Sequence, residues 1–229
     1  MMSRTRRLLR AVIFAVALTI PVAVLAYLIR SESGGVVAFD EAAVRAATDF
    51  TRDRPALYQA LLLWQEAFNA RWVNLGVSLV ALWVWRRRGL PTRAAWAFGT
   101  LMVSWGLGLV VKFIVQRARP VVEDALGDPP GYSFPSGHAT NTAAAGLILL
   151  LLLWPLLRTR GRALLTTAVA AAVVLTALNR VFLGAHYPSD VVAGVVLGVA
   201  MAGASYLGYV GWAPAPSPTT TPTPARSET

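Results

Sequence analysis

The chain has 229 residues, of which 56% are hydrophobic and only 14% are charged, a composition too apolar for an ordinary soluble domain. It contains no cysteine, which excludes a disulfide framework, a thiolate metal site and a cysteine nucleophile. The formal net charge of +10 does not by itself indicate nucleic-acid binding, because the positions of the charges matter more than their sum. Apolar runs of roughly 18 or more residues recur, and they predict an all-α integral membrane protein with six transmembrane helices in one bundle.

The N-terminal segment, residues 1–30, combines a basic start with the first apolar run, Ala11–Ile29. Four arginines fall within the first ten residues. The run predicts a first transmembrane helix, in which Pro21 is tolerated as a kink. A secretory signal peptide is the alternative, because Val24-Leu25-Ala26 resembles a cleavage site. Either interpretation puts the following residues on the outer side of the membrane.

Residues 31–70 are more polar and form a predicted outer-side segment between the first two spans. Asp40 is predicted to cap a short helix that runs through Phe50, and Pro55 is predicted to open another that runs through Ala67. Apolar residues recur at helical spacing in the second of these helices, which favours helices that lie along the membrane interface. A solvated loop with two short helices is the alternative.

Residues 71–212 complete the bundle with five further spans. The second span, extended back to Phe68, reaches Trp85 and ends at three consecutive arginines, and the others are predicted at 94–115, 138–157, 163–178 and 191–212. With both termini cytoplasmic, the inner segments hold 12 of the 21 basic residues but only one of the 11 acidic residues, as the positive-inside rule requires. The Pro/Thr/Ser-rich tail, residues 213–229, cannot pack a core and is predicted to be disordered.

The unusual polar residues fall at the outer ends of four predicted spans: Lys112 and Arg119, Ser136 with Gly137 and His138, Arg180, and His186 with Asp190. Each group has an ordinary structural explanation, since Lys and Arg at helix ends commonly extend to lipid headgroups and a single His–Asp pair is often structural. An N-cap and its following N–H groups can, however, bind an anion, and a carboxylate can accept a hydrogen bond from Nδ1–H of a histidine. Because all four groups converge on one face, they predict a phosphate site.

The pattern Lys112-x6-Arg119-Pro120, Pro135-Ser136-Gly137-His138 and Arg180-x5-His186-x3-Asp190 resembles the three-part signature of the type 2 phosphatidic acid phosphatase superfamily. These are the lipid phosphate phosphatases, here of the bacterial membrane branch, and their site is related to that of vanadium haloperoxidases. The resemblance covers about residues 40–212. The family often has Ser before the arginine of the third motif, where this chain has Asn179, so a changed phosphate contact is expected.

The resemblance implies that His186 is the nucleophile and forms a phosphohistidine, that Asp190 orients it, and that His138 protonates the leaving oxygen. It further implies a set of residues that hold the phosphate: Lys112, Arg119, Ser136, Gly137 and Arg180. Phosphoryl transfer depends mostly on positioning and on neutralising phosphate charge, which these residues suit. No metal and no other cofactor is expected, because both histidines are already assigned and only one carboxylate is near.

The expected function is hydrolysis of the terminal phosphate of a membrane lipid phosphate or diphosphate, at the extracytoplasmic side of a bacterial cell membrane and without nucleic acid. Undecaprenyl diphosphate, phosphatidic acid and phosphatidylglycerol phosphate all qualify, and an Ala/Arg/Val-rich composition favours a cell-envelope lipid of the undecaprenyl type. The alternatives are a phosphotransferase with the same site, a vanadate-dependent peroxidase, against which six spans argue, and a non-catalytic scaffold or transporter. The oligomeric state is left unassigned.

Overall fold

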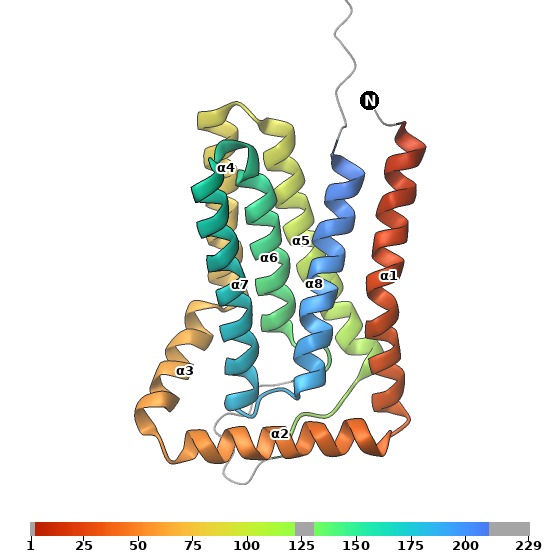
Figure 1. Ribbon diagram of the computed structural model, residues 1–229, viewed down its shortest axis with the longest axis vertical. Helices are drawn as coiled ribbons and strands as arrows, with labels where there is room; N and C mark the ends of the chain where they lie inside the picture. Colours follow the sequence, from red (N-terminus) through yellow and green to blue (C-terminus); the bar gives the residue numbers. More distant parts are fainter. Residues whose placement is uncertain (1–2, 122–130, 211–229) are drawn as a thin grey trace, which may run out of the picture.

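The computed structural model describes residues 3–121 and 131–210, and in these ranges the chain is helical with no strand. The helices in order are α1 (Arg4–Arg30), α2 (Gly34–Arg52), α3 (Pro55–Ala67), α4 (Ala70–Arg88), α5 (Pro91–Val115), α6 (Gly137–Leu153) with a 3₁₀ turn (Trp154–Leu156), α7 (Thr159–Phe182) and α8 (Pro188–Tyr209). Figure 1 shows α1 and α4 to α8 standing side by side, with α2 lying across one end of the bundle. The predicted all-α membrane fold is confirmed.

Within residues 3–121 and 131–210, five helices are long and apolar enough to cross a membrane: α1, α5, α6 with its 3₁₀ turn, α7 and α8. The helices α3 and α4 reach that standard only together, and they are bent by 48° at the break between them. The second span predicted from the sequence therefore corresponds to α4, which α3 continues beyond the bend. Asn69 caps α4 at this point by accepting a hydrogen bond from the Arg71 N–H at 3.2 Å, which fixes the place of the break.

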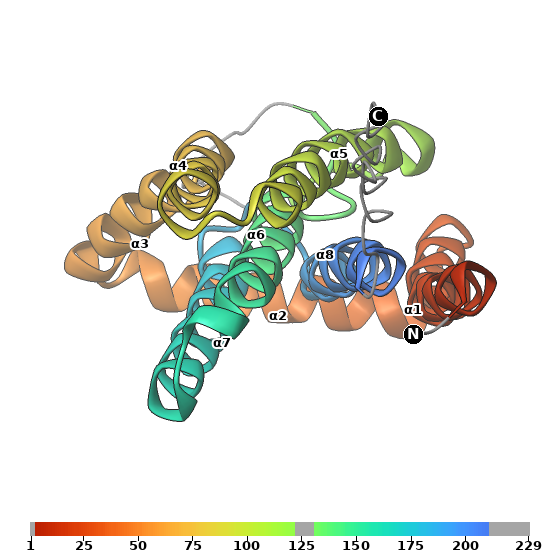
Figure 2. The ribbon, with the colours of Figure 1, turned by 90° about the horizontal axis from the view of Figure 1, so that it is seen from above.

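The helix predicted to begin at Asp40 begins earlier, at Gly34, so the assignment of Asp40 as its N-cap is wrong. Val36 and Val37 extend the amphipathic pattern upstream, and this places Asp40 nearly two turns inside α2. One stripe of α2 faces the bundle and is buried at helical spacing: Asp40, Val44, Ala47, Thr48 and Thr51. Figure 2 shows α2 running beneath α7 and α8 toward α1, and the helix contacts all three.

The close packing of α6 against α8 holds the two predicted histidine segments together. A Cβ added to Gly194 would lie 2.8 Å from the Ser136 carbonyl oxygen, and Gly198 is similarly pressed against the α6 backbone. Small residues let two helix backbones approach closely in this way. The Ser136 N–H also donates to the Asp190 carbonyl at 3.0 Å. The start of α6 is thus fixed against the start of α8.

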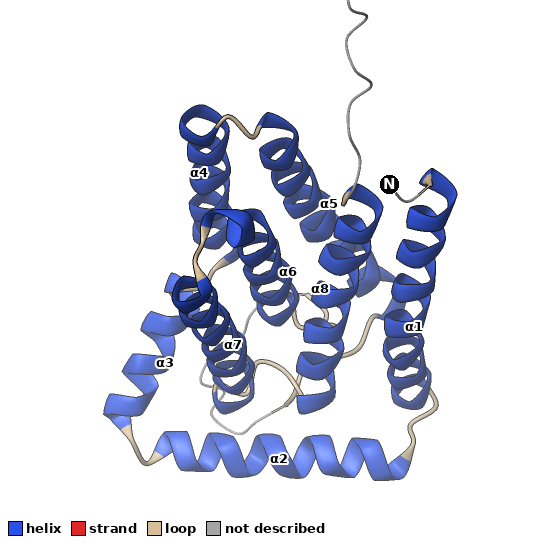
Figure 3. Cartoon of the chain, turned by 45° about the horizontal axis from the view of Figure 1, so that its top comes forward, coloured by secondary structure: helices blue, strands red, loops and turns tan. Residues whose placement is uncertain are grey.

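The connections divide between the two ends of the bundle (Figure 3). The start of α1, the α4–α5 turn, the α6–α7 turn and the end of α8 lie at the end opposite to α2. These are the segments in which the sequence concentrates its predicted inner basic residues. The predicted disordered tail, 213–229, lies outside the described residues.

Candidate active site

The first motif begins in α5 and continues beyond the end of that helix. A helix ending near Arg119 would put Lys112 and Arg119 on one helical face, but α5 ends at Val115 and Gln116 adopts a left-handed φ of 53°. The following residues are not helical, and Arg117 reaches Asp190 at the start of α8. Lys112 Nζ donates to the Tyr132 carbonyl at 2.8 Å, and Arg119 Nε donates to the Gly131 carbonyl at 3.0 Å. The two cations therefore converge by holding the 131–132 loop between them.

His186 faces one of these cations. Arg119 Nη1 lies 3.3 Å from Nε2 of His186 and donates to the Ala185 carbonyl at 2.8 Å. A guanidinium has only donors, so Nε2 must be the acceptor nitrogen and the proton of the neutral ring must sit on Nδ1. The lone pair of Nε2 therefore points at the cation that is predicted to hold phosphate.

Asp190 approaches the other ring nitrogen, although less directly than predicted. Its Oδ2 atom lies 3.7 Å from Nδ1 of His186, which is longer than a hydrogen bond. Ser133 lies between them, because its hydroxyl donates to Oδ2 of Asp190 and its Oγ is 3.4 Å from Nδ1. The Tyr187 N–H also donates to Oδ2, at 2.9 Å. A serine hydroxyl thus links the carboxylate to the imidazole.

His186 is buried, with 3% of its surface exposed. Burial lowers the pKa of the His186 imidazole to about 3, because desolvation disfavours the charged ring, even though the nearby Asp190 carboxylate opposes the shift. The positive charges of Arg180 and Lys112 act in the same direction as burial. The ring is therefore neutral at neutral pH, which is the form that has a free lone pair.

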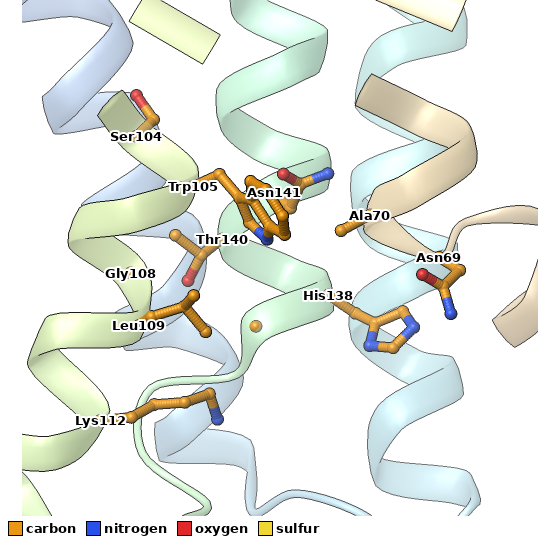
Figure 4. A pocket seen from close by; sticks show the side chains of 11 residues that line it. Asn69, Ala70, Ser104, Trp105, Gly108, Leu109, Lys112, His138, Thr140 and Asn141 are labelled. Atoms are coloured by element: carbon orange, nitrogen blue, oxygen red, sulfur yellow. The ribbon is translucent and has the colours of Figure 1, made fainter. Parts of the chain in front are cut away.

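His138 and Lys112 line a cavity of about 160 Å³ between α4, α5 and α6. Figure 4 shows their side chains at one end of it, with Ser104 and Trp105 at the other. His138 Nε2 has no hydrogen-bond partner among the described residues. Ser136 occupies the predicted N-cap position of α6, but its buried hydroxyl makes no cap hydrogen bond. Gly137, which follows it, also lines the cavity and faces Lys112.

Arg180 is the third predicted cation, and it is 98% buried at the end of α7, with 2% of its surface exposed. Its Nη1 donates to the Gln65 side chain in α3, while its Nε has no partner within residues 3–121 and 131–210. The structure therefore brings together on one end of the bundle all the residues that the sequence selects.

Comparison with known proteins identifies the family. The sequence profile of the PAP2 superfamily matches residues 93–212, which is more than half of the chain and contains all three motifs. The chain belongs to the PAP2 superfamily. The family predicted from the motifs is confirmed.

Curated relatives match the chain over about half of its length or somewhat more. A decaprenylphosphoryl-5-phosphoribose phosphatase of Mycobacterium tuberculosis is 39% identical over 119 residues, which cover 49% of this chain and 57% of that protein. A lipid A 1-phosphatase of Rhizobium etli is 34% identical over 45% of each chain. An undecaprenyl-diphosphatase of Sulfolobus acidocaldarius is 29% identical over 62% of this chain and 66% of its own length. The chain thus spans about half to two thirds of the curated relatives it matches.

One solved structure shares the fold. The first transmembrane PAP2-type phosphatidylglycerolphosphate phosphatase structure, from Bacillus subtilis, superposes with a TM-score of 0.73 at 23% identity. The match covers 84% of this chain and 94% of that one. It therefore extends the shared PAP2 architecture beyond the segment that the family profile covers.

Sequence reasoning missed Arg117, which lies inside the first PAP2 motif but outside its matched positions. Arg117 Nη1 donates to Oδ1 of Asp190 at 2.7 Å and its Nη2 donates to Oδ2 of Asp40 at 2.8 Å. The signal that was available was a third basic residue between Lys112 and Arg119. Nothing in the local pattern indicates that its partners come from α2 and α8.

Asn179 departs from the serine that is frequent in the PAP2 motif, and its amide is used for packing. Its Nδ2 donates to the Leu61 carbonyl in α3 at 2.7 Å, and the side chain is 1% exposed. One turn along α3, Gln65 accepts from Arg180. Asn179 and Arg180 together fasten α3 against the end of α7.

The described part of the chain contains no group of three or more His, Cys, Asp or Glu side chains arranged to hold a metal ion. The carboxylates nearest the site, Asp190 and Asp40, are both occupied by Arg117. These groups are committed to ion pairs with protein side chains.

Proposed function

We propose that this protein is a membrane phosphatase that hydrolyses the terminal phosphate of a lipid phosphate or diphosphate through a phosphohistidine on His186, without a metal. The observation that carries the proposal is the 3.3 Å approach of Arg119 Nη1 to Nε2 of His186. It aims a neutral imidazole lone pair at a guanidinium, and Lys112 and Arg180 add two further cations to the same end of the bundle. Preorganised cations of this kind stabilise the charge that develops on a transferring phosphoryl group.

In the first step Nε2 of His186 attacks phosphorus, and the bond from phosphorus to the leaving oxygen breaks. His138 donates a proton to that oxygen, a role supported by the absence of any partner for its Nε2 atom among the described residues. The Nδ1 proton of His186 stays on the ring and is held by Ser133 and Asp190, which stabilises the cationic phosphohistidine.

In the second step water attacks phosphorus and the P–N bond breaks. His138, now neutral, takes the proton from the attacking water, and inorganic phosphate leaves with the Nε2 lone pair restored. Transfer to an alcohol in place of water is the phosphotransferase alternative, and it would use the same residues.

The cavity beside His138 supports a lipid as the leaving group. It runs along α5 from Lys112 to Ser104, eight residues or about 12 Å at 1.5 Å per residue, into the membrane-spanning part of the helix. Its deeper walls include Trp105, Leu109 and Ala70, which suit an apolar chain. A substrate bound there has its phosphate at the bundle end and its tail among α4, α5 and α6.

Two of the relatives described above carry names with polyprenyl substrates, and these favour a polyprenyl-linked phosphate over a glycerophospholipid. The undecaprenyl type expected from the sequence falls in this class. Other relatives are named for lipid A and for phosphatidylglycerophosphate, so glycerophospholipids are also tested as substrates below.

We place the site on the extracytoplasmic side of the cell membrane, with both termini in the cytoplasm. The distribution of basic residues supports this orientation, because the predicted inner segments lie together at the end opposite to α2. The chain lacks cysteine, so single cysteines test the orientation cleanly: Val121→Cys, in a side chain that is 98% exposed, and Thr159→Cys at the opposite end. A membrane-impermeant thiol reagent should label only the first in intact cells; labelling of only the second reverses the topology.

The test of activity is release of inorganic phosphate by the purified protein in detergent with a chelator present. The substrates are undecaprenyl diphosphate, decaprenylphosphoryl-5-phosphoribose, phosphatidic acid, phosphatidylglycerol phosphate and a soluble phosphate ester. We expect release from the lipids to exceed release from the ester, and to vanish in His186→Ala while that variant stays folded.

Three results would count against the proposal. Phosphate release that requires a divalent ion would contradict the proposal that hydrolysis needs no metal. A ³²P-labelled phosphoprotein trapped in His186→Ala would remove the nucleophile assignment. Phosphate transfer to an added alcohol, without release of inorganic phosphate, would replace the hydrolase by the transferase.

A further inference from the structure

We propose that Asp40 and Arg117 are positioning residues of the site, forming a buried ion-pair chain that holds Asp190 in place beside His186. The ion pairs of Asp40, Arg117 and Asp190 join three segments that are far apart in sequence: α2, the loop after α5, and the first turn of α8. This inference rests on the proposed role of His186 and adds residues that are not among the matched positions of the three PAP2 motifs.

Arg117 is the central residue of these ion pairs, because it pairs with both Asp40 and Asp190. Its side chain is 9% exposed, and its guanidinium donates to Asp190 at 2.7 Å, to Asp40 at 2.8 Å and to the Ser189 hydroxyl at 2.8 Å. The guanidinium carbon also lies 4.0 Å from the centre of the Tyr187 ring. Although burial opposes it, the two carboxylates raise the pKa of Arg117, so the group stays charged. These contacts tie α2 to the first turn of α8 through one guanidinium.

Asp40, in α2, is the second carboxylate that pairs with Arg117. Its carboxylate is 0% exposed, and besides Arg117 it accepts from the Ser189 N–H at 3.0 Å and from the Ser189 hydroxyl. Ser189 is the second residue of α8, so a carboxylate from α2 caps the N-terminus of α8, where the helix dipole favours negative charge. A buried carboxylate is costly unless it is paired and hydrogen-bonded. Here Arg117 supplies the opposite charge and Ser189 supplies two hydrogen bonds.

The consequence is that both oxygens of Asp190 are fixed. Oδ1 accepts from Arg117, while Oδ2 accepts from Ser133 and from the Tyr187 N–H. The carboxylate therefore has one orientation, with Oδ2 toward Nδ1 of His186. Without Arg117 the Oδ1 atom loses its hydrogen bond, and only the two contacts of Oδ2 hold the carboxylate beside the imidazole.

Because Arg117 and Asp40 carry opposite charges, the proposal can be tested by measuring the pKa of His186 in variants of each. The other charged groups near His186 are Asp190, Arg119, Arg180 and Lys112, and they are the same in every variant compared below. Arg117→Gln removes a positive charge next to Asp190, which favours the imidazolium and raises the pKa of His186. Asp40→Asn removes a negative charge, which leaves Arg117 less compensated and lowers the pKa of His186.

The experiment follows the two histidines by NMR in detergent-solubilised protein labelled only at histidine, with His138→Gln to assign the signals. We expect Arg117→Gln to raise the pKa of His186 by about one unit or more, Arg117→Lys to stay near the wild type, and Asp40→Asn to keep the ring neutral to a lower pH. Glu41→Gln is the matched control, because it removes an exposed carboxylate from the next position of α2. It should leave the titration unchanged.

Turnover gives the second readout. Because Arg117 and Asp40 act through Asp190 in this proposal, kcat should fall about tenfold or more in Arg117→Gln while KM stays within about threefold, with Arg117→Lys recovering part of the loss. Shifts of the same direction in Arg117→Gln and Asp40→Asn, or an unchanged kcat, overturn the proposal. If Arg117→Gln does not fold, the double variant Asp40→Asn/Arg117→Gln, which keeps the net charge, must still lose kcat. Shifts of the expected directions in a protein that releases no phosphate would retain the positioning role and reject the proposed function.

Discussion

The guanidinium of Arg119 lies 3.3 Å from Nε2 of His186, with no other group between them. The contact joins the first PAP2 motif to the third, and it decides which ring nitrogen carries the lone pair. Two predictions depend on this pair directly.

The first prediction concerns the shape of the Arg119 side chain. Its Nε and Nη1 atoms bond to Gly131 and Ala185, so the guanidinium is held as a planar fork facing the imidazole. Arg119→Lys keeps the charge but cannot make these contacts together, and we expect kcat/KM to fall about 10²-fold, close to the loss in Arg119→Ala. Arg45→Lys, at an exposed position on α2, is the control and should have no effect. Full activity in Arg119→Lys would mean that charge alone is sufficient.

The second prediction concerns pH. Because burial lowers the pKa of His186 to about 3 from an ordinary value near 6.5, the folded protein leaves the ring neutral where the unfolded chain protonates it. Stability from this group is therefore complete above about pH 6.5 and is lost as the pH falls from there toward 3. The unfolding temperature in detergent should decrease across this window, and the decrease should be smaller in His186→Gln.

The rate of acylation of His186 by diethyl pyrocarbonate, which needs the neutral ring, should not fall between about pH 7 and 5 as it does for free histidine. A fall with a midpoint near 6.5 would contradict the assignment.

The motif residues were predictable from sequence because their signal is local. Ser136, Gly137 and His138 occupy one turn, and His186 and Asp190 lie four positions apart across the start of α8. The order of apolar spans places the ends of these helices at one face of the membrane, so convergence follows without knowledge of any single contact.

The supporting contacts were not predictable, because they join segments far apart along the chain. Asp40 reads as an N-cap from its neighbours, and only the packing of α2 across α8 makes it a partner of Arg117 and Ser189. The third span ends at residue 115 as predicted, where the left-handed Gln116 stops α5.

The third prediction tests the departure from the family pattern at position 179. Asn179 Nδ2 reaches the Leu61 carbonyl at 2.7 Å, a distance that the shorter serine side chain cannot span. Asn179→Ser should lose about 1 kcal/mol of stability, with little change in the inhibition constant for inorganic phosphate. Asn74→Ser, a buried asparagine of α4 with an unpartnered Oδ1, should lose less. Tighter phosphate binding in Asn179→Ser, without loss of stability, would instead make position 179 a phosphate contact.

The fourth prediction separates the leaving-group cavity from the phosphate site. Asn141 lies one turn beyond His138 on the same face of α6, lines the cavity, and has a buried Nδ2 with no partner in the described chain (Figure 4). An amide donor at this depth suits an acceptor oxygen on the leaving group, such as the inner phosphate of a lipid diphosphate. Asn141→Leu keeps the size of the side chain and removes the donor.

We therefore expect Asn141→Leu to lower kcat/KM for a lipid diphosphate about tenfold, the loss of one hydrogen bond, and to leave a soluble phosphate ester unaffected. Thr142→Val is the matched control, because Thr142 is the next residue of α6, is equally buried with an unpartnered hydroxyl, and lines a different cavity against α7. Equal losses on both substrates would show that Asn141 supports the fold of α6, whereas a loss confined to lipid substrates places the leaving group between α4, α5 and α6.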